Sequence, residues 1–271
     1  AEEVLGVALG LQKGGADVID LGSAPGEPWP ALSQTVKILC DAGLRVSIES
    51  FNPGEVETAI AAGAKLVLSV NSQVIDRAVN WDAEVVVIPD DHRGSHWLDE
   101  LLVLHERLMQ AGVKHRFDPI VEPIGFGFAD SLQRYHALRQ ALPDAEMMMG
   151  IGNLTELTEV DSAGVNALLI GFCQELHVRS VLTTEVINWA RTATAEIDIA
   201  RRLMHAACTQ HRLPKHLDHR LVMLRDHRLL RRTKQDLKLI HEQIKDPNFR
   251  IFAEEGEVHA MNHEHFESDT D

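Results

Sequence analysis

The chain has 271 residues, 45% of them apolar and 25% charged, so it is long enough and apolar enough to bury a sizeable core. Its 41 acidic and 26 basic residues leave a formal charge of −15 at pH 7. Nucleic acids and anionic membranes bind positive surfaces, so neither is expected as a general partner. The sequence has no apolar run of about 18 residues and therefore predicts no membrane-spanning helix.

The three cysteines, Cys40, Cys173 and Cys208, lie far apart in apolar, helix-like segments. An odd number of well-separated cysteines does not suggest a disulfide framework or a zinc site. We therefore expect buried thiols in a reducing compartment and a cytoplasmic protein.

Helices and short apolar runs alternate along the chain. Five long helices are predicted in this part: residues 2–13, 29–42, 54–62, 98–111 and 163–176. Several of them end at a glycine, the residue favoured just beyond a helix, and Asp161 is a predicted N-cap for the last. Apolar runs of about four residues are typical of parallel strands buried on both faces. They predict seven strands: residues 18–21, 46–48, 66–70, 85–88, 116–120, 147–149 and 180–183.

This alternation predicts a parallel sheet with right-handed crossovers. A TIM-type (β/α)8 barrel has eight strands, whereas the chain offers seven and opens within a helix. We therefore expect such a barrel, with its first strand upstream of Ala1. An open doubly wound sheet is the alternative, although no strand is followed by the G-x-G-x-x-G turn of a Rossmann fold.

The character of the chain changes after Ala207, so we expect a barrel over residues 1–207 and a small, incomplete α+β extension over residues 208–271. The extension contains a predicted amphipathic helix and a hairpin whose turn is Glu254-Glu255-Gly256. The acidic, histidine-rich residues 262–271 are expected to be frayed or truncated. His259, His263 and His265 have a spacing that metal ligands use, but an acidic tail is more often solvated.

Polar side chains follow the predicted strands, where barrel enzymes have their active sites. Carboxylates or amides stand at most strand ends: Asp20, Glu49, Asn71, Asp90, Asp118, Glu122, Asn153 and Glu185. Such acceptors could bind a donor-rich heterocycle, or hold Mg²⁺ on a phosphorylated substrate. The alternative is that some of them, Asp90 and Asp118 above all, cap the following helices. Gly150 and Gly152 offer backbone N–H groups to a phosphate, or form an ordinary turn.

Four segments resemble dihydropteroate synthases, in that family's order: GADVIDLG at residues 15–22, VSIES at 46–50, AGA at 62–64 and GFG at 125–127. The resemblance covers about residues 2–191. It implies a pterin-binding barrel that transfers a dihydropterin from its diphosphate to an arylamine, with Mg²⁺ on the diphosphate. It also implies a homodimer.

The sequence departs from that family at two pterin-side positions and, more strongly, at the positions of the family's cations. Glu49 stands where the family has an aspartate, and Asn71 lies near the place of its Asn-Asp pair. Its lysine is replaced by Phe128, and its basic groups after the last two strands are replaced by residues 152–155 and 183–185. The pterin-facing carboxylates therefore survive approximately, whereas the family's diphosphate-binding and aminobenzoate-binding cations do not.

Segments 122–129, 147–158 and 161–166 are similar to dihydropteroate synthase-related proteins of archaea and methylotrophic bacteria. That branch is associated with tetrahydromethanopterin synthesis, and its chains carry extra domains on both sides of the barrel. The implied acceptor is 4-(β-D-ribofuranosyl)aminobenzene 5′-phosphate, a neutral aniline with a phosphate. Changed residues on the acceptor side are consistent with it.

This resemblance implies a role for each strand end. Glu49, Asp118 and Glu122 would accept hydrogen bonds from the pterin, and Asn71 would add an amide contact. Asp20 or a residue of the missing strand would be the Mg²⁺ ligand. The predicted substrate-binding set is Asp20, Glu49, Asn71, Asp90, Asp118, Glu122, Gly150, Gly152, Asn153, Thr184, Glu185, Asn188 and Arg191, the glycine turn with Asn188 or Arg191 holding the acceptor phosphate. No catalytic residue can be assigned.

Two other functions remain open at this point. A methyl-pterin:corrinoid methyltransferase of the same superfamily would also place Asp and Asn after its strands. A non-catalytic pterin-binding or scaffold subunit would retain the carboxylates without the cations. A requirement for a corrinoid partner indicates the first, and pterin affinity without turnover indicates the second.

Overall fold

A computed structural model describes residues 2–22, 28–223, 231–254 and 256–270. The chain divides into two compact units, Ala1–Arg225 (the barrel unit) and Asp226–Asp271 (the C-terminal unit). Residue 207, where the sequence analysis sets its boundary, lies inside a helix that continues to Gln210. Within the described ranges, every helix is too short or too polar to cross a membrane.

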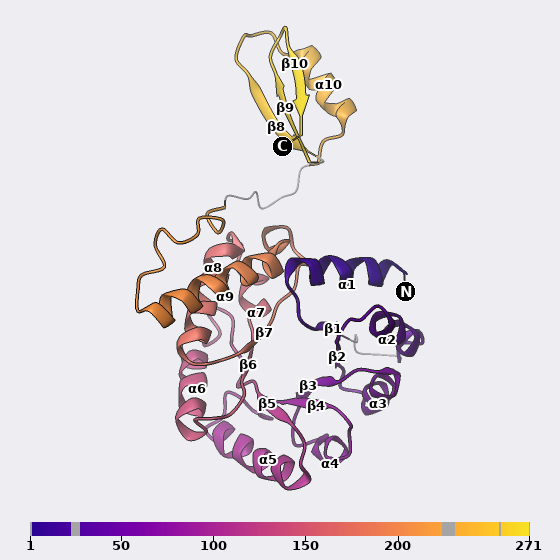
Figure 1. Cartoon of the computed structure of the whole chain (residues 1–271), viewed down its shortest axis with the longest axis vertical. Helices are drawn as coiled ribbons and strands as arrows, with labels where there is room; N and C mark the ends of the chain where they lie inside the picture. The colour runs from indigo at the N-terminus through magenta and orange to yellow at the C-terminus, as the bar shows by residue number, and fades with distance from the viewer. Residues whose placement is uncertain (1, 23–27, 224–230, 255, 271) are drawn as a thin grey trace. The chain divides into compact units, whose positions relative to one another are not determined.

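Seven parallel strands form the inner layer of the barrel unit (Figure 1). They are β1 (Ile19–Gly22), β2 (Val46–Glu49), β3 (Leu66–Val70), β4 (Glu84–Val87), β5 (His115–Phe117), β6 (Met148–Gly150) and β7 (Ser180–Leu182). Strands β1 to β5 pair in chain order, β6 pairs with β7, and a bridge from Phe117 to Met147 joins the two sets. All seven predicted strands are confirmed, as is the α/β class.

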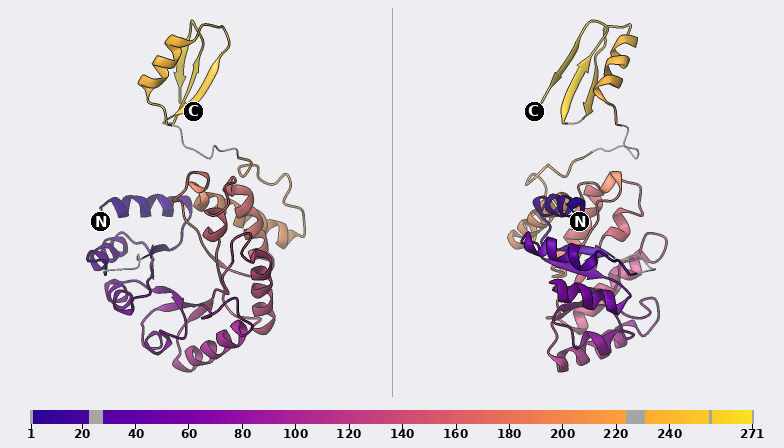
Figure 2. Two further views of the ribbon diagram at one scale, coloured as in Figure 1. Left: turned by 180° about the vertical axis from the view of Figure 1, so that it is seen from behind. Right: turned by 90° about the vertical axis from the view of Figure 1, so that its right-hand side faces the viewer.

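Helices cover the outside of these strands, as the two views in Figure 2 show. They are α1 (Glu2–Gly14), α2 (Leu32–Asp41), α3 (Pro53–Ala62), α4 (Ile75–Ala78), α5 (Trp97–Ala111), α6 (Phe128–Ala141), α7 (Gly152–Thr155), α8 (Ser162–Glu175) and α9 (Ala193–Gln210), with a 3₁₀ turn η1 (Asn188–Ala190). The predicted glycine stops are confirmed at Gly63 and Gly112, whose φ angles of 124° and 70° disfavour a Cβ.

The strands are buried on both faces, which explains why their sequences are continuous apolar runs. Val85 and Val87 belong to the main core between the strands and the helices, whereas Val86 packs inside the ring with Leu68 and Met148. The three consecutive methionines of β6 are accordingly strand core. Because all seven strands are parallel, their carboxyl ends lie at one end of the barrel, where the loops to the next helices begin.

The C-terminal unit is a helix and an antiparallel sheet. It comprises α10 (Lys234–Gln243), β8 (Arg250–Glu254), β9 (Glu257–Met261) and β10 (Phe266–Asp269). Its sheet order is β10-β9-β8, and Thr233 and Asp236 form a capping box at the start of α10. The predicted hairpin is confirmed, although Glu255 in its turn lies outside the described residues.

The expectation that residues 262–271 are frayed was wrong. Their strand β10 pairs with β9 in antiparallel register, and Asn262 Oδ1 accepts hydrogen bonds from the N–H groups of Glu264 and His265. His259 is buried, and its Nδ1 lies 2.7 Å from Ser268 Oγ. Among the described residues there is no group of three side chains placed to bind a metal.

Candidate active site

The carboxyl ends of the strands carry an acidic cluster, which we define as Asp20, Glu49 and Asp118. Asp20 and Glu49 come from neighbouring strands, and Asp118 follows β5 directly. Two serines, Ser47 on β2 and Ser69 on β3, donate to the first two carboxylates. Ser47 Oγ lies 2.5 Å from Asp20 Oδ1, and Ser69 Oγ lies 2.6 Å from Glu49 Oε1.

Burial controls the charge of Asp20. Loss of water, with a smaller contribution from the nearby charge of Glu49, raises the pKa of Asp20 to about 6, against the hydrogen bond from Ser47. At neutral pH the side chain is therefore ionised. Because the carboxylate has lost water, hydrogen-bond donors from a ligand would stabilise its charged form. This is the condition expected of a ligand-binding carboxylate rather than of a solvated surface group.

Asp118 is more deeply held, with 8% of its surface exposed. Burial raises its pKa to about 6, although the Tyr135 hydroxyl, 2.5 Å from Oδ1, and the N–H groups of Ile120 and Gly150 donate to it. The charge of Glu49 acts in the same direction as burial. Glu49 therefore couples to both aspartates, which places the three carboxylates in one electrostatic unit.

A second cluster combines Glu122 with His92 and Arg93, and we call it the Arg93–Glu122 cluster. Arg93 Nε lies 2.7 Å from Glu122 Oε1 and its Nη2 lies 3.0 Å from Oε2, so the guanidinium binds the carboxylate with two parallel bonds. His92 Nε2 lies 2.6 Å from Oε1. Arg93, followed by His92, holds the pKa of Glu122 below its usual range. Glu122 is predicted to accept hydrogen bonds from a pterin, but in this structure Arg93 binds both of its carboxylate oxygens.

The loop after β5 is fixed by side chains from two other elements. The buried Arg134 on α6 donates to the carbonyl oxygens of Pro119 and Ile120 at 2.9 Å and 2.6 Å. Asn153, beyond β6, donates from Nδ2 to Val121 O at 3.1 Å. Asp118 and Glu122 therefore keep their positions without a ligand, as a preorganised site requires.

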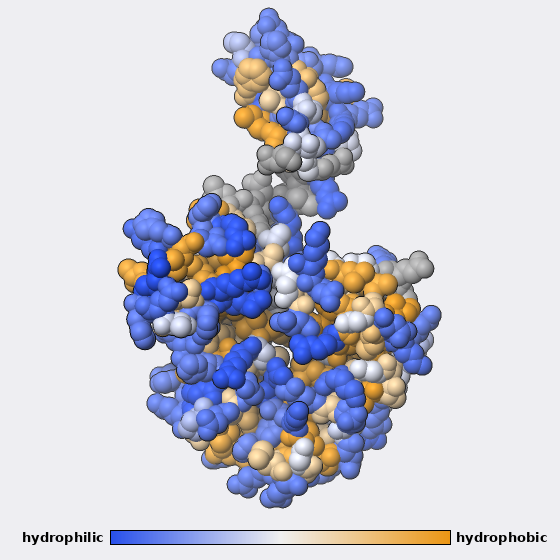
Figure 3. Space-filling view, in the orientation of Figure 1, coloured by the Kyte–Doolittle hydropathy of each residue, from blue (hydrophilic) through white to orange (hydrophobic). Residues whose placement is uncertain are grey.

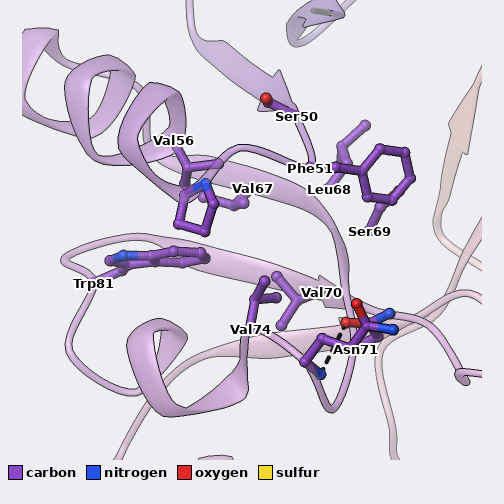
Figure 4. Close-up of a pocket in the computed structure, with 12 residues that line it drawn as sticks. Ser50, Phe51, Val56, Val67, Leu68, Ser69, Val70, Asn71, Val74 and Trp81 are labelled. Atoms are coloured by element: carbon purple, nitrogen blue, oxygen red, sulfur yellow. Dashed lines mark hydrogen bonds between the residues drawn. The ribbon is translucent and has the colours of Figure 1, made fainter. Parts of the chain in front are cut away.

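Two amide and carboxylate side chains of the predicted set serve their own loops. Asn71 Oδ1 accepts from the N–H of Gln73 at 3.1 Å, and Figure 4 shows this side chain folded back on its turn. Asp90 is exposed, and its Oδ1 accepts from the N–H of Ser72 at 3.2 Å. Both contacts fit the turn-forming alternative, and the substrate-binding roles of both residues stay predictions.

The remaining predicted residues lie after β6 and β7. Glu185 Oε1 accepts from the N–H of Thr194 in the first turn of α9 at 2.9 Å. Arg191 donates to Asn188 Oδ1 at 2.6 Å, and Thr184 donates to Glu156. Gly150 donates to Asp118, and Gly152 begins a helix of one turn. The role of the glycine turn in holding a phosphate stays a prediction.

A small hollow of about 60 Å³ lies at the ends of β2 and β3 beside the acidic cluster. Figure 4 shows Phe51, Leu68 and Ser69 on one side of it and Val56 and Trp81 on the other. Ser69 connects the hollow to the cluster through its bond to Glu49. In the wider view of Figure 3, hydrophilic side chains gather over the centre of the barrel unit.

Asp20 and Glu49 fit part of a magnesium site. Carboxylate oxygens are the protein ligands that Mg²⁺ prefers, and Mg²⁺ commonly takes only one or two of them together with substrate phosphates. The repulsion between the two side chains is what a cation would relieve. As stated above, the described residues contain no three-ligand group, so the fit is to a shared ion and not to an all-protein cage.

Sequence reasoning missed His92 and Arg93, the two residues that bind Glu122 in this cluster. Both follow Asp90 in the loop after β4, so the rule that selected the other strand ends could have found them. They were missed because only acceptors were sought at that strand end and because cations were sought where the resembling family has them.

No protein-family profile matches the chain. An uncharacterized protein of Methanocaldococcus jannaschii is 32% identical over 233 residues, which cover 79% of this chain and 44% of that protein. The chain thus spans less than half the length of this curated relative.

Solved structures of dihydropteroate synthases share the fold. The Thermus thermophilus enzyme in complex with 6HMPPP superposes with a TM-score of 0.59 at 20% identity, over 76% of this chain and 89% of that one. The Yersinia pestis enzyme with a sulfonamide drug gives 0.59 at 16% identity, over 77% and 86%. An α/β barrel with an acidic mouth is thus the class that the structure defines. The chain has the dihydropteroate synthase fold, which confirms the predicted barrel and, at the level of the fold, the resemblance.

Proposed function

We propose that this chain is the pterin-binding barrel of a dihydropteroate synthase-like transferase. The observation that carries the proposal is the acidic cluster, in which the charge of Glu49 acts on the half-buried Asp20 and the buried Asp118 at the barrel mouth. The fold supports it, because enzymes of this fold have been determined with 6HMPPP, 4-aminobenzoate and 7,8-dihydropteroate.

The chemistry of a pterin suits this cluster. Its ring presents an amino group and ring N–H groups along its edge, which are donors, and the cluster presents carboxylates that lack a cation of their own in the described structure. A buried carboxylate with a raised pKa gains most from a ligand that donates hydrogen bonds to it. Tyr135 orients the Asp118 carboxylate and Ser69 orients that of Glu49, so these side chains lose little conformational entropy when a ligand binds.

The proposed reaction needs positioning more than proton transfer. The C–O bond between the pterin methylene carbon and the diphosphate breaks, the diphosphate leaves with the electron pair, and a C–N bond forms to the arylamine nitrogen. That nitrogen then loses a proton to water. Carboxylates facing the pterin ring would stabilise the positive charge that develops on it. Mg²⁺, shared with Asp20, would stabilise the departing diphosphate.

We propose 4-(β-D-ribofuranosyl)aminobenzene 5′-phosphate as the arylamine, which would place the protein in tetrahydromethanopterin biosynthesis. The support is the absence from this sequence of the basic residues with which the resembling family binds a carboxylated acceptor. A homodimer and a cytoplasmic location belong to the same proposal.

The test is diphosphate release by the protein with Mg²⁺ and 6-hydroxymethyl-7,8-dihydropterin diphosphate, with two acceptors compared side by side. Release with the ribofuranosyl aniline phosphate and not with 4-aminobenzoate supports the proposed acceptor. Release with 4-aminobenzoate overturns it in favour of folate synthesis. Pterin binding with no release from either acceptor overturns the transferase and favours a binding subunit or a corrinoid-dependent methyltransferase.

A further inference from the structure

The Arg93–Glu122 cluster places positive charge at the mouth of a barrel in a chain whose formal charge is −15. Glu122 is anchored below, with 6% of its side-chain surface exposed, whereas 59% of the Arg93 side chain is exposed. Arg134 lies close enough to interact electrostatically with the Glu122 carboxylate and with the Arg93 guanidinium. Around Glu122 there are thus two guanidinium groups and a histidine, while the carboxylates of Asp91 and Asp130 act on Arg93 and Arg134. Arg93 is the guanidinium of this group with an exposed side chain.

We propose that Arg93, together with His92, is the subsite that binds the phosphate groups of the substrate. The proposal rests on the proposed function and assigns it an anion site that the sequence analysis took to be lost. The ligand class is a diphosphate monoester of an aromatic heterocycle. The acidic cluster would take the donor-rich ring, and the Arg93–Glu122 cluster would take the anionic end.

The geometry of Arg93 suits this role. Glu122 engages Nε and Nη2, and the hydrogen bonds of the described residues leave Nη1 unused. A guanidinium clamped on one edge by a buried carboxylate loses little further freedom when its other edge binds an anion. Its planar donors match phosphate oxygens, and such charge-assisted bonds are the strong ones among polar contacts.

The position of the two clusters supports ring binding at the acidic cluster and anion binding at the Arg93–Glu122 cluster. Asp118 and Glu122 lie on one loop, which Arg134 holds through two carbonyl oxygens. Asp118 and Glu122, which anchors Arg93, are thus held four residues apart on one ordered loop, which suits a ligand with a ring at Asp118 and an anionic substituent at Arg93. The alternative is that Arg93 serves only to neutralise the buried Glu122.

Two ligands that differ only in the diphosphate separate these roles. Calorimetry would compare 6-hydroxymethyl-7,8-dihydropterin with its diphosphate, for the full chain and for Arg93→Gln and Arg93→Lys. We expect Arg93→Gln to lose about tenfold or more in affinity for the diphosphate, since it loses a charge-assisted hydrogen bond to the anion, and to keep the affinity for the alcohol within about twofold. Arg93→Lys retains the positive charge without the planar guanidinium. Its affinity for the diphosphate is expected to lie between those of the unchanged chain and of Arg93→Gln.

The matched control is Arg77→Gln on α4, which removes another surface arginine paired with a glutamate, Glu57. It is expected to change neither affinity. An equal loss of affinity for alcohol and diphosphate in Arg93→Gln would overturn the proposal and leave Arg93 as a structural neutraliser. An unchanged diphosphate affinity would also overturn it.

Inorganic pyrophosphate as a probe keeps this test separate from the proposed function. If neither pterin compound binds the full chain, the proposed function fails. Pyrophosphate that binds the full chain and not Arg93→Gln would then still support the anion subsite, and pyrophosphate that binds both proteins equally would overturn it.

Discussion

Asp118 and Glu122 lie four residues apart on the same loop and are buried to a similar degree, with 8% and 5% of their surfaces exposed. Their pKa values nevertheless shift in opposite directions. Burial raises the pKa of Asp118 to about 6, whereas Arg93 and His92 hold the pKa of Glu122 below its usual range. The difference comes from their partners: Asp118 accepts from neutral donors, and Glu122 faces cations.

Two carboxylates that are equivalent in the sequence therefore have different chemical roles. Arg93 already compensates the charge of the Glu122 carboxylate, so a ligand that brings hydrogen-bond donors stabilises this carboxylate little further. The Asp118 charge is not compensated, so donors from a ligand stabilise it. The loop thus separates a face that selects donors from a face that selects anions. The variants below test that separation, together with the Arg93 variants described above.

The largest effect is expected from neutralising the acidic cluster. Glu49→Gln and Asp118→Asn should each lower the affinity for 6-hydroxymethyl-7,8-dihydropterin about 10- to 100-fold, because a hydrogen bond to a charged group contributes about 1.5–3 kcal/mol. Titration calorimetry at pH 7.5 measures the effect, and circular dichroism checks that the variants fold. Glu49→Gln bears most directly on the proposal, since Glu49 couples to both aspartates.

Asp82→Asn is the matched control for that comparison. Asp82 lies before β4, at the amino ends of the strands, where it is exposed and paired with Lys65. Its amide variant should bind the pterin as the unchanged chain does. Full pterin affinity in Glu49→Gln would contradict the central claim, and equal losses in all three variants would mean that the net charge of the barrel unit, not the cluster, governs binding.

The fold could be predicted from the sequence because its signals are local. Continuous apolar runs such as Val85-Val86-Val87 can only be buried on both faces, and Gly63 and Gly112 stop their helices. The strand β10 was not predictable in this way. Its sequence, Phe-Glu-Ser-Asp, is polar on one face, and its stability comes from pairing with β9.

The site was predictable in composition and not in charge. The strand-end rule finds Asp20, Glu49 and Asp118, but it cannot show that Glu122 is bound to Arg93, a residue 29 positions away. Nor can it show that the Asn71 side chain closes its own turn. Which carboxylates are compensated depends on contacts between loops that follow different strands, and spacing along a sequence carries no record of those contacts.

A smaller effect is expected from pH. If the ionised forms of Asp20 and Asp118 accept from the pterin, affinity should fall as pH drops through about 6, the pKa of both side chains. Each carboxylate whose ionised form is required contributes about tenfold between pH 7.5 and 5. Calorimetry over this range in the unchanged chain and in Asp118→Asn measures it. The variant should have a shallower pH dependence, and identical profiles for the two proteins would contradict the assignment.

The smallest effect is on stability, and its sign is diagnostic. The folded chain must hold Asp20 charged above pH 6, whereas the unfolded chain ionises it from about pH 4. The unfolding free energy should therefore fall as pH rises from 4 to 6, by up to about 3 kcal/mol for this group. Asp20→Asn removes that cost, because its amide oxygen can still accept from Ser47.

We expect Asp20→Asn to be more stable than the unchanged chain by about 1–2 kcal/mol at pH 7.5, and no more stable at pH 4.5. Urea unfolding followed by tryptophan fluorescence reports on the barrel unit alone, because all four tryptophans, Trp29, Trp81, Trp97 and Trp189, lie within it. A variant that loses pterin affinity while gaining stability would show that the uncompensated charge is maintained for binding. Loss of stability at pH 7.5 would instead mean that Asp20 is a structural acceptor like Glu122.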